Sequence, residues 1–358
     1  MKKRHPRVVA TAAIAAFALI AVGCGDDDDD GGSDTTAASE PAAEESAAEE
    51  PAEEPAEASG DDVTRIAIVA PSAQNDLAFT QSIVDSVNRV GETRAIEVDI
   101  TDGTFVVEDA AAAIRGYADA GFDLVIAHGS QYGAPLSEIA ADFPDTAFAW
   151  GTAAETFGLD NVSSYTVRAD EGGYVNGVIA AQLTESNTLG VVGPIEVGDA
   201  KLYVDGFVAG VAAQNPDATV NVNYIESFSD VALASEAANA HIANGADMLT
   251  GTAQMVVGAT GVALEEGVPW FGTQSNQTAL GPEIVVASQV YHWEVVLNEI
   301  LDSVEAGTLG GSVYIADLEN GGIVMEFNEG FALSDEVRAS ADATIAGLGD
   351  GSLSTGIE

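Results

Sequence analysis

The chain has 358 residues, with 58 Asp and Glu against 11 Lys and Arg, and its formal net charge at pH 7 is −47. Residues 63–358 hold 42 of these acids and seven of the bases, a net charge of −35. A chain this acidic would repel the phosphates of nucleic acids and the headgroups of an anionic membrane, so we expect neither as a partner. We interpret the charge as a means of solubility or of salt tolerance.

Residues 1–24 have the pattern of an export signal. A basic stretch over 1–7 precedes an apolar run over 8–22, which is shorter than the roughly 20 residues of a membrane span. The run ends in AVGC, which resembles a bacterial lipobox whose Cys24 is lipidated. We therefore predict a lipoprotein signal peptide and a lipid anchor at Cys24, on the extracytoplasmic face of the cell membrane. The alternative is an ordinary cleaved signal in which Cys24, the single cysteine, is incidental.

Residues 25–62 are of low complexity, with a run of five Asp followed by loose PAEE-like repeats. They offer little apolar surface to bury, and their like charges repel one another. We expect a disordered acidic tether.

From residue 63 onward, β-rich runs alternate with helical patterns. The expected strands are 65–71, 95–100, 123–128, 146–152, 163–168, 189–192, 219–225, 247–252, 269–273 and 284–288. The expected helices are 78–90, 107–120, 135–142, 171–183, 201–214, 231–244, 256–266 and 293–306. Strands that are apolar on both faces, each followed by a helix, predict an α/β fold of mainly parallel, doubly wound sheets.

The length of this part favours two lobes, because one ordinary core rarely grows so large. We expect lobe 1 to comprise 63–170 and about 271–300, and lobe 2 to comprise 171–270 and about 301–358. In the tail we expect a hairpin of strands 313–316 and 323–327, and then a last helix over 335–346.

Ligands of open α/β sheets bind beyond the carboxyl ends of the strands. The segments that follow seven of the ten strands are rich in aromatic and neutral polar residues. The candidate ligand-binding residues are Asn75, Asp76, Phe79, Ser130, Gln131, Trp150, Thr152, Phe228, Asp230, Gln254, Gln274, Asn276 and Tyr291. Amides and hydroxyls both donate and accept hydrogen bonds, and aromatic faces stack on flat rings. The set therefore suits a neutral planar heterocycle, whereas a phosphate or carboxylate would call for Arg or Lys.

Structural roles remain open for several of these residues. Asn75, Asp76 and Asp230 have the positions of helix caps. Phe228 has the position of a residue packed between lobes. His128, after the third strand, is more typical of a hydrogen-bonded core residue than of a ligand contact.

Five segments, in consistent order over most of 63–310, resemble the basic membrane protein family. They are NDLAFTQ, DEGGYVNGVIAAQLTESNTLGVVG, VDGFVAGV, NVNYIESFSD and NGADMLTGTAQ. Members of this family are solute-binding lipoproteins of ABC importers and are related to purine nucleoside receptors. The resemblance implies a two-lobed periplasmic-binding-protein fold of type I.

The resemblance also implies a purine gripped between aromatic rings at Phe79 and Phe228, with Asp76 in the opening loop. Three positions depart from the pattern of nucleoside binders. Thr152 and Gln274 stand where those proteins have Asp, and Tyr291 stands where they have Lys. Without this ribose clamp, a free nucleobase or another flat heterocycle such as a flavin fits as well as a nucleoside.

We therefore predict a monomeric solute-binding lipoprotein that works with ABC permease and ATPase subunits, without cofactor or metal. The alternative is an extracytoplasmic sensor subunit for a similar ligand. An enzyme such as a nucleoside hydrolase is least favoured, because no GxSxG, HExxH or P-loop motif is present. A transcription regulator of this fold would need a helix-turn-helix. The N-terminus of this chain has the pattern of an export signal and a tether instead.

Overall fold

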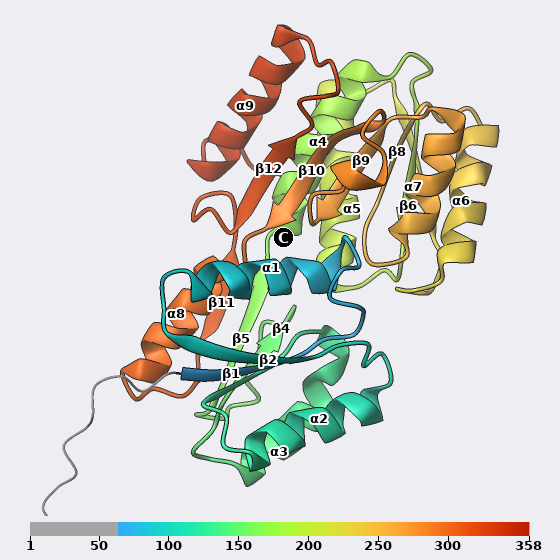
Figure 1. Cartoon of the computed structure of the whole chain (residues 1–358). Coiled ribbons are helices and arrows are strands. Elements are labelled where there is room, and N and C mark those ends of the chain that lie inside the picture. Colours follow the sequence, from blue (N-terminus) through green and yellow to red (C-terminus); the bar gives the residue numbers. More distant parts are fainter. Residues whose placement is uncertain (1–63, 358) are drawn as a thin grey trace, which may run out of the picture. The chain divides into compact units, whose positions relative to one another are not determined.

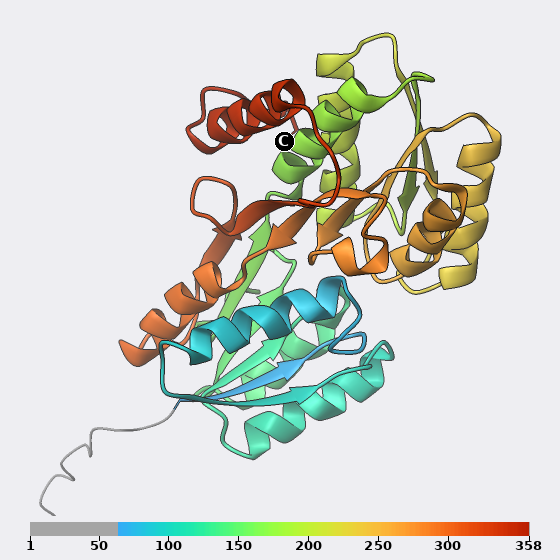
Figure 2. The ribbon, with the colours of Figure 1, turned by 45° about the horizontal axis from the view of Figure 1, so that its top comes forward.

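A computed structural model describes residues 64–357 (Figures 1 and 2). The predicted signal peptide, Cys24 and the acidic tether lie outside the described residues. Residues 64–357 belong to one compact unit, which contains two six-stranded sheets. No helix among residues 64–357 combines the length and the apolar character that a membrane crossing requires.

The first sheet is parallel throughout and has the order β11-β5-β4-β3-β1-β2. Its strands are β1 (Thr64–Val69), β2 (Ile96–Thr101), β3 (Leu124–Ala127), β4 (Ala147–Gly151), β5 (Val162–Val167) and β11 (Val313–Ala316). Its helices are α1 (Phe79–Gly91), α2 (Val107–Asp119), α3 (Gly133–Asp142) and α8 (Glu294–Glu305). Side chains alternate along β1: Ile66 and Ile68 share a core with α1 and α8, whereas Ala67 and Val69 share one with α2 and α3. Helices therefore cover both faces of the sheet.

The second sheet has the order β12-β10-β9-β8-β6-β7, with β12 antiparallel to β10. Its strands are β6 (Thr188–Gly193), β7 (Thr219–Tyr224), β8 (Met248–Gly251), β9 (Trp270–Gln274), β10 (Val285–Tyr291) and β12 (Ile323–Phe327). Helices α4 (Ala169–Leu183), α5 (Gly198–Gln214) and α9 (Asp335–Gly349) share a core on one face, and α6 (Val231–Ala243) and α7 (Val256–Glu266) share a core on the other. The α/β class and the doubly wound architecture predicted from the sequence are thus confirmed.

Three chain segments connect the two sheets (Figure 2). The chain passes from β5 to α4, returns from β10 to α8, and passes again from β11 to β12. The expected assignment of 271–300 to lobe 1 is therefore wrong for β9 and β10, because β9 pairs with β8 and β10 pairs with β9 in the second sheet. Only α8 and β11 return to the first.

The expected hairpin of 313–316 and 323–327 is also wrong. β11 pairs with β5 in one sheet and β12 pairs with β10 in the other. The intervening turn therefore bridges the lobes. Hydrogen bonds from the Arg168 N–H to the Ala316 carbonyl and from the His292 N–H to the Gly322 carbonyl, both 2.9 Å, join the three crossing segments side by side.

Glycines allow α4 and α5 to pack closely at the start of the second lobe. A β-carbon on Gly177 would lie 2.2 Å from the Phe207 carbonyl oxygen, and one on Gly206 would lie 2.1 Å from the Asp170 carbonyl oxygen. Real β-carbons do not approach a backbone atom so closely, so any larger side chain would push the two helices apart. The contact fixes the position of the first turn of α5.

We predict that Gly177→Ala lowers the free energy of unfolding by about 1–3 kcal/mol, the usual cost of overpacking. Gly116→Ala in α2 is the matched control, because a β-carbon there meets nothing within 4 Å. The control should be neutral or gain up to about 1 kcal/mol from helix propensity. Urea unfolding measures both, and a Gly177→Ala protein as stable as the wild type would contradict the prediction.

Candidate functional site

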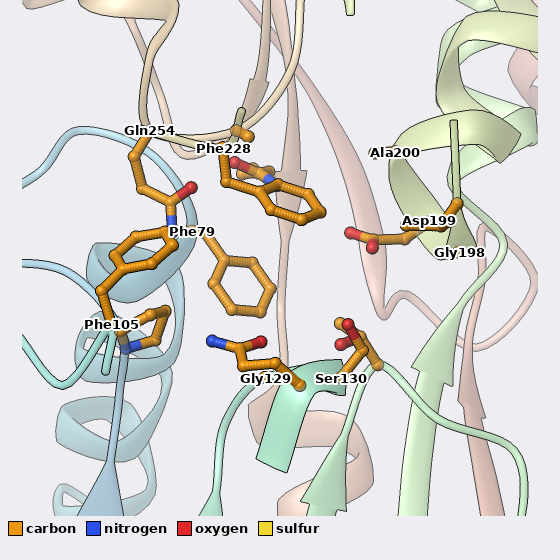
Figure 3. A pocket seen from close by; sticks show the side chains of 15 residues that line it. Phe79, Phe105, Gly129, Ser130, Gly198, Asp199, Ala200, Phe228 and Gln254 are labelled. Carbon is orange, nitrogen blue, oxygen red and sulfur yellow. The ribbon is translucent and has the colours of Figure 1, made fainter. Parts of the chain in front are cut away.

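A cavity of about 470 Å³, partly open to solvent, lies where the carboxyl ends of the two sheets face each other (Figure 3). The lining from the first lobe is Pro71, Phe79, Phe105, Gly129, Ser130, Gln131 and Thr152. The lining from the second lobe is Val197, Gly198, Asp199, Ala200, Phe228, Ala253, Gln254 and Gln274. That volume includes solvent at the open side of the cavity. The strand-end position is the usual one for ligands of parallel sheets.

Phenylalanine rings from both lobes enter the cavity. Phe79, the first residue of α1, is 7% exposed, and its ring stacks on His128 with 4.1 Å between centroids and 12° between planes. Phe228 is partly buried in the loop after β7 and approaches from the other lobe (Figure 3). The Met255 N–H donates to the Phe228 carbonyl at 3.1 Å, which ties this loop to the one that carries Gln254.

His128 supports the Phe79 ring as a neutral residue. Burial lowers the pKa of His128 to about 3, although a contact with the Phe79 carbonyl opposes the effect. Its Nδ1 lies 2.7 Å from the Tyr165 hydroxyl. His128 is therefore a hydrogen-bonded core residue, as expected from the sequence.

Polar side chains of the lining lack partners inside the protein. The amide oxygens of Gln254 and Gln274 are buried without a hydrogen bond, and so is the nearby Thr252 hydroxyl. Burying such groups unpaired costs free energy, so each unpaired group calls for an explanation. A ligand in the cavity would supply it.

The backbone of the lining is strained at three residues other than glycine. Thr152, Ala253 and Gln274 have φ of 56°, 74° and 71°, in the left-handed region that side chains disfavour. Such strain costs about 1–3 kcal/mol per residue and gathers at ligand sites. All three stand just past or at the ends of β4, β8 and β9.

Asp199, in the first turn of α5, is the one ionisable side chain of the lining. Burial raises the pKa of Asp199 to about 6, against the opposing effect of backbone N–H groups at Asp199 and Ala200. The Tyr291 hydroxyl lies beside it and opposes the shift too, although it makes no hydrogen bond of normal length and angle. Each of the seven Lys and Arg among the described residues is instead paired with an acid.

Seven of the predicted site residues line the cavity: Phe79, Ser130, Gln131, Thr152, Phe228, Gln254 and Gln274. The other six lie outside it. Among these, Asp76 caps α1, because its carboxylate accepts hydrogen bonds from the Ser72 hydroxyl at 2.7 Å and from three backbone N–H groups. Asp230 caps α6 through the Leu233 N–H at 2.9 Å. Their side chains are thus used within their own loops.

The other four predicted residues, which are Asn75, Asn276, Trp150 and Tyr291, also lie outside the cavity lining. Asn75 is exposed, and Asn276 is exposed and donates to Glu326 at 2.5 Å. Trp150 stacks on Phe157 and donates to the Gly129 carbonyl at 3.1 Å, so it positions the loop before Ser130 and Gln131. Tyr291 is fully buried in the core behind Asp199.

Sequence reasoning missed Asp199 and Phe105, and a usable signal was present for both. Phe105 follows β2, and Val197 to Ala200 follow β6. The strand-end rule that selects the other candidates also covers these two loops. Applied to all ten strands, it would have added Phe105 and Asp199.

We predict that Asp199→Asn stabilises the ligand-free protein at pH 7.5. A raised carboxyl pKa means that the folded state loses stability as the pH rises from about 3.8 to about 6, and that the whole cost is present above pH 6. Removing the charge should therefore gain up to about 3 kcal/mol at pH 7.5, less where solvent screens it, and only about 0.5 kcal/mol at pH 4.

Urea unfolding at pH 7.5 and pH 4 tests this expectation. Glu196→Gln, in the exposed part of the same loop, is the control for the change in net charge. An equal gain for Asp199→Asn at both pH values would show that shape, not charge, is responsible.

Comparison with known proteins gives consistent matches over the folded part. The profile of the family described as ABC transporter substrate-binding protein PnrA-like matches residues 63–344. A purine-binding protein of Brucella abortus is 28% identical over 281 residues, which span 78% of this chain and 77% of that protein. The transcriptional activator protein Med of Bacillus subtilis is 25% identical over 74% of this chain and 82% of its own length.

Among solved structures, an ABC transporter solute-binding protein from Conexibacter woesei is 27% identical, with a TM-score of 0.69. The match covers 82% of this chain and 98% of that one. The resemblance seen in the sequence is thereby confirmed, and the chain belongs to the PnrA-like family of ABC transporter substrate-binding proteins.

Proposed function

We propose that this chain is an extracytoplasmic solute-binding lipoprotein of an ABC importer, and that it binds a planar heteroaromatic solute between its two lobes. The observation that carries the proposal is a cavity with Phe79 from one lobe and Phe228 from the other, and with no Lys or Arg in its lining. Two such rings stack well on the faces of a flat heterocycle. The relative named as a purine-binding protein supports a purine as the solute.

A nucleobase fits the lining better than a nucleoside or a nucleotide. Thr152 and Gln274 line the cavity at the positions where the family resemblance implies Asp in nucleoside binders, and Tyr291 lies outside the lining. A phosphate would require a cation or a cluster of free N–H donors, whereas all described Lys and Arg are engaged in ion pairs. The lining therefore lacks the two carboxylates and the lysine of the expected ribose clamp, and it offers no cation to a phosphate.

The described conformation has contacts across the cleft that suit a closing movement. The Ser275 hydroxyl donates to the Ala78 carbonyl at 2.8 Å, and the Gln277 amide donates to the Leu77 carbonyl at 3.3 Å. Each pair joins the second lobe to the loop that precedes α1. In the proposed cycle the solute binds to open lobes, these contacts form on closure, and the closed monomer docks on the permease and its ATPase.

Two other functions are less well supported. A sensor subunit would use the same cavity, and the relative in Bacillus subtilis is named as a transcriptional activator. Stimulation of the ATPase by the loaded protein, in vesicles with the permease, would favour transport over sensing. A nucleoside hydrolase would need a pair of carboxylates or a metal for acid–base chemistry, and the lining has one carboxylate.

We predict that Phe228→Ala and Phe79→Leu each weaken adenine binding by roughly 5-fold to 150-fold. Stacking on an aromatic ring is worth about 1–3 kcal/mol per base, and both changes remove one ring face. Calorimetric titration of the purified protein measures the dissociation constant. Phe79 is buried, so leucine is used to preserve apolar volume.

Phe143→Leu is the control, because Phe143 is a partly buried residue packed against α2 and α3, away from the cavity. It should bind adenine as the wild type does. If both site variants bind adenine and other flat heterocycles normally, the rings are not the binding surface and the proposed solute class is wrong.

A further inference from the structure

The cavity has an uneven distribution of charge. Asp199 is its one ionisable lining residue, and Figure 3 shows the carboxylate directed into the cavity from the side opposite Phe105 and Gln254. No cation of the protein balances it. Lys201, two residues later, pairs instead with Asp205 at 2.5 Å and with Glu196 at 3.5 Å.

The groups packed around Asp199 leave its carboxylate available. Tyr291 on β10 is the titratable side chain that faces it from the second sheet, and burial keeps the pKa of that hydroxyl well above its ordinary value. On the first lobe, His128 is buried and neutral. The carboxylate therefore has hydroxyl and backbone neighbours but no positive partner.

A second observation points to a ligand in the same place. Gln274 is 2% exposed and lines the cavity, and its amide oxygen has no hydrogen-bond partner. The Gln254 amide oxygen is in the same state. Two side-chain amides without partners call for polar edges on the solute, and the carboxylate in the same cavity calls for a hydrogen-bond donor opposite it.

The position of Asp199 is fixed by the fold. It lies in the first turn of α5, whose axis is set by the glycine-mediated contact with α4. The helix N-terminus favours a negative charge at this point. The carboxylate is therefore presented rigidly, as specificity requires.

We propose that Asp199 is a specificity-determining residue and that the solute presents an N–H donor to it, as an amino-substituted heterocycle does. The inference rests on the proposed function of the cavity and adds the chemistry of one edge of the solute. The carboxylate accepts a charge-assisted hydrogen bond from an amino group. It repels a carbonyl oxygen, a carboxylate or a phosphate at the same point, so discrimination arises from rejection as well as attraction.

Matched pairs of bases that exchange an amino group for an oxo group test this selectivity. Adenine and hypoxanthine form one pair, and cytosine and uracil form another. Titration at pH 7.5 should show at least a tenfold preference of the wild type for the amino member of the pair that binds. Asp199→Asn should lose at least tenfold in affinity for that member and should reduce the preference to less than threefold.

Glu196→Gln is the matched control, since it removes one negative charge from the same loop outside the cavity lining. It should leave the preference unchanged, which separates a direct contact from the field of an acidic protein. Spermidine is included as a flexible polyamine without a ring. If spermidine binds to the wild type but not to Asp199→Asn, and none of the bases binds, Asp199 is a recognition group and the solute is not heteroaromatic.

The other outcomes overturn the inference. If Asp199→Asn keeps the wild-type preference while Phe228→Ala abolishes binding, the cavity binds a heterocycle but Asp199 does not select it. If the wild type prefers the oxo members, the donor assignment is wrong. If neither the bases nor spermidine bind to the wild type, both the solute class and the role of Asp199 fail.

Discussion

Three chain crossings joined by hydrogen bonds determine how the two lobes of this protein meet. Asp170 is fully buried at the start of α4, where it pairs with Arg168 at 2.9 Å and accepts from the Thr355 hydroxyl at 2.6 Å. The Gln289 amide on β10 donates to the Ala169 carbonyl at 3.2 Å. A buried carboxylate must be paired and hydrogen-bonded to be tolerated, so these partners hold the crossing from β5 to α4 beside β10 and the C-terminal tail. The carboxyl ends of both sheets consequently face one cavity.

The unfavourable features of the described structure gather at that cavity. Its lining includes three residues with positive φ, which are Thr152, Ala253 and Gln274. It also includes unpaired amide oxygens and a carboxylate without a cation. Each feature lowers the stability of the ligand-free protein, and the well-packed sheets and helices around it offset the cost. A bound solute that donates hydrogen bonds would relieve the unpaired acceptors. The lining of the cavity is therefore less favourable in free energy than the rest of the fold, because it presents polar groups without partners to the solute.

The sequence predicted the fold well because the signal was repeated. Ten apolar strands and the helices between them give many independent indications of parallel sheets, and an error of two residues in one boundary changes little. The lobe of β9 and β10 could not be predicted in the same way, because an apolar strand such as Trp270–Gln274 fits the interior of either sheet. Pairing depends on contacts far apart in sequence. The same reason explains why β11 and β12 resembled a hairpin while they belong to different sheets.

The sequence predicted those residues of the candidate site whose place directly after a strand brings them to the cavity. Residues directly after a strand reach the cavity, as Gln131, Thr152 and Gln254 do. A short polar side chain with a backbone N–H within reach hydrogen-bonds to that N–H and caps the helix, and so does not reach the cavity. Asp76 and Asp230 are examples.

Asp199 shows a further limit of composition-based reasoning. In a chain with 58 acids, the residue type of one more loop Asp carries no signal, and only its position after β6 marks it as a candidate. It becomes distinctive in the structure because the fold half-buries it, turns it toward the cavity and leaves all seven Lys and Arg of the described part in pairs with other acids. Most of the acids among residues 64–357 face solvent, where water and salt screen them. The same side chain in a partly enclosed cavity acts through a lower dielectric, so a single unbalanced carboxylate there influences the choice of solute more than the net charge of the whole surface does.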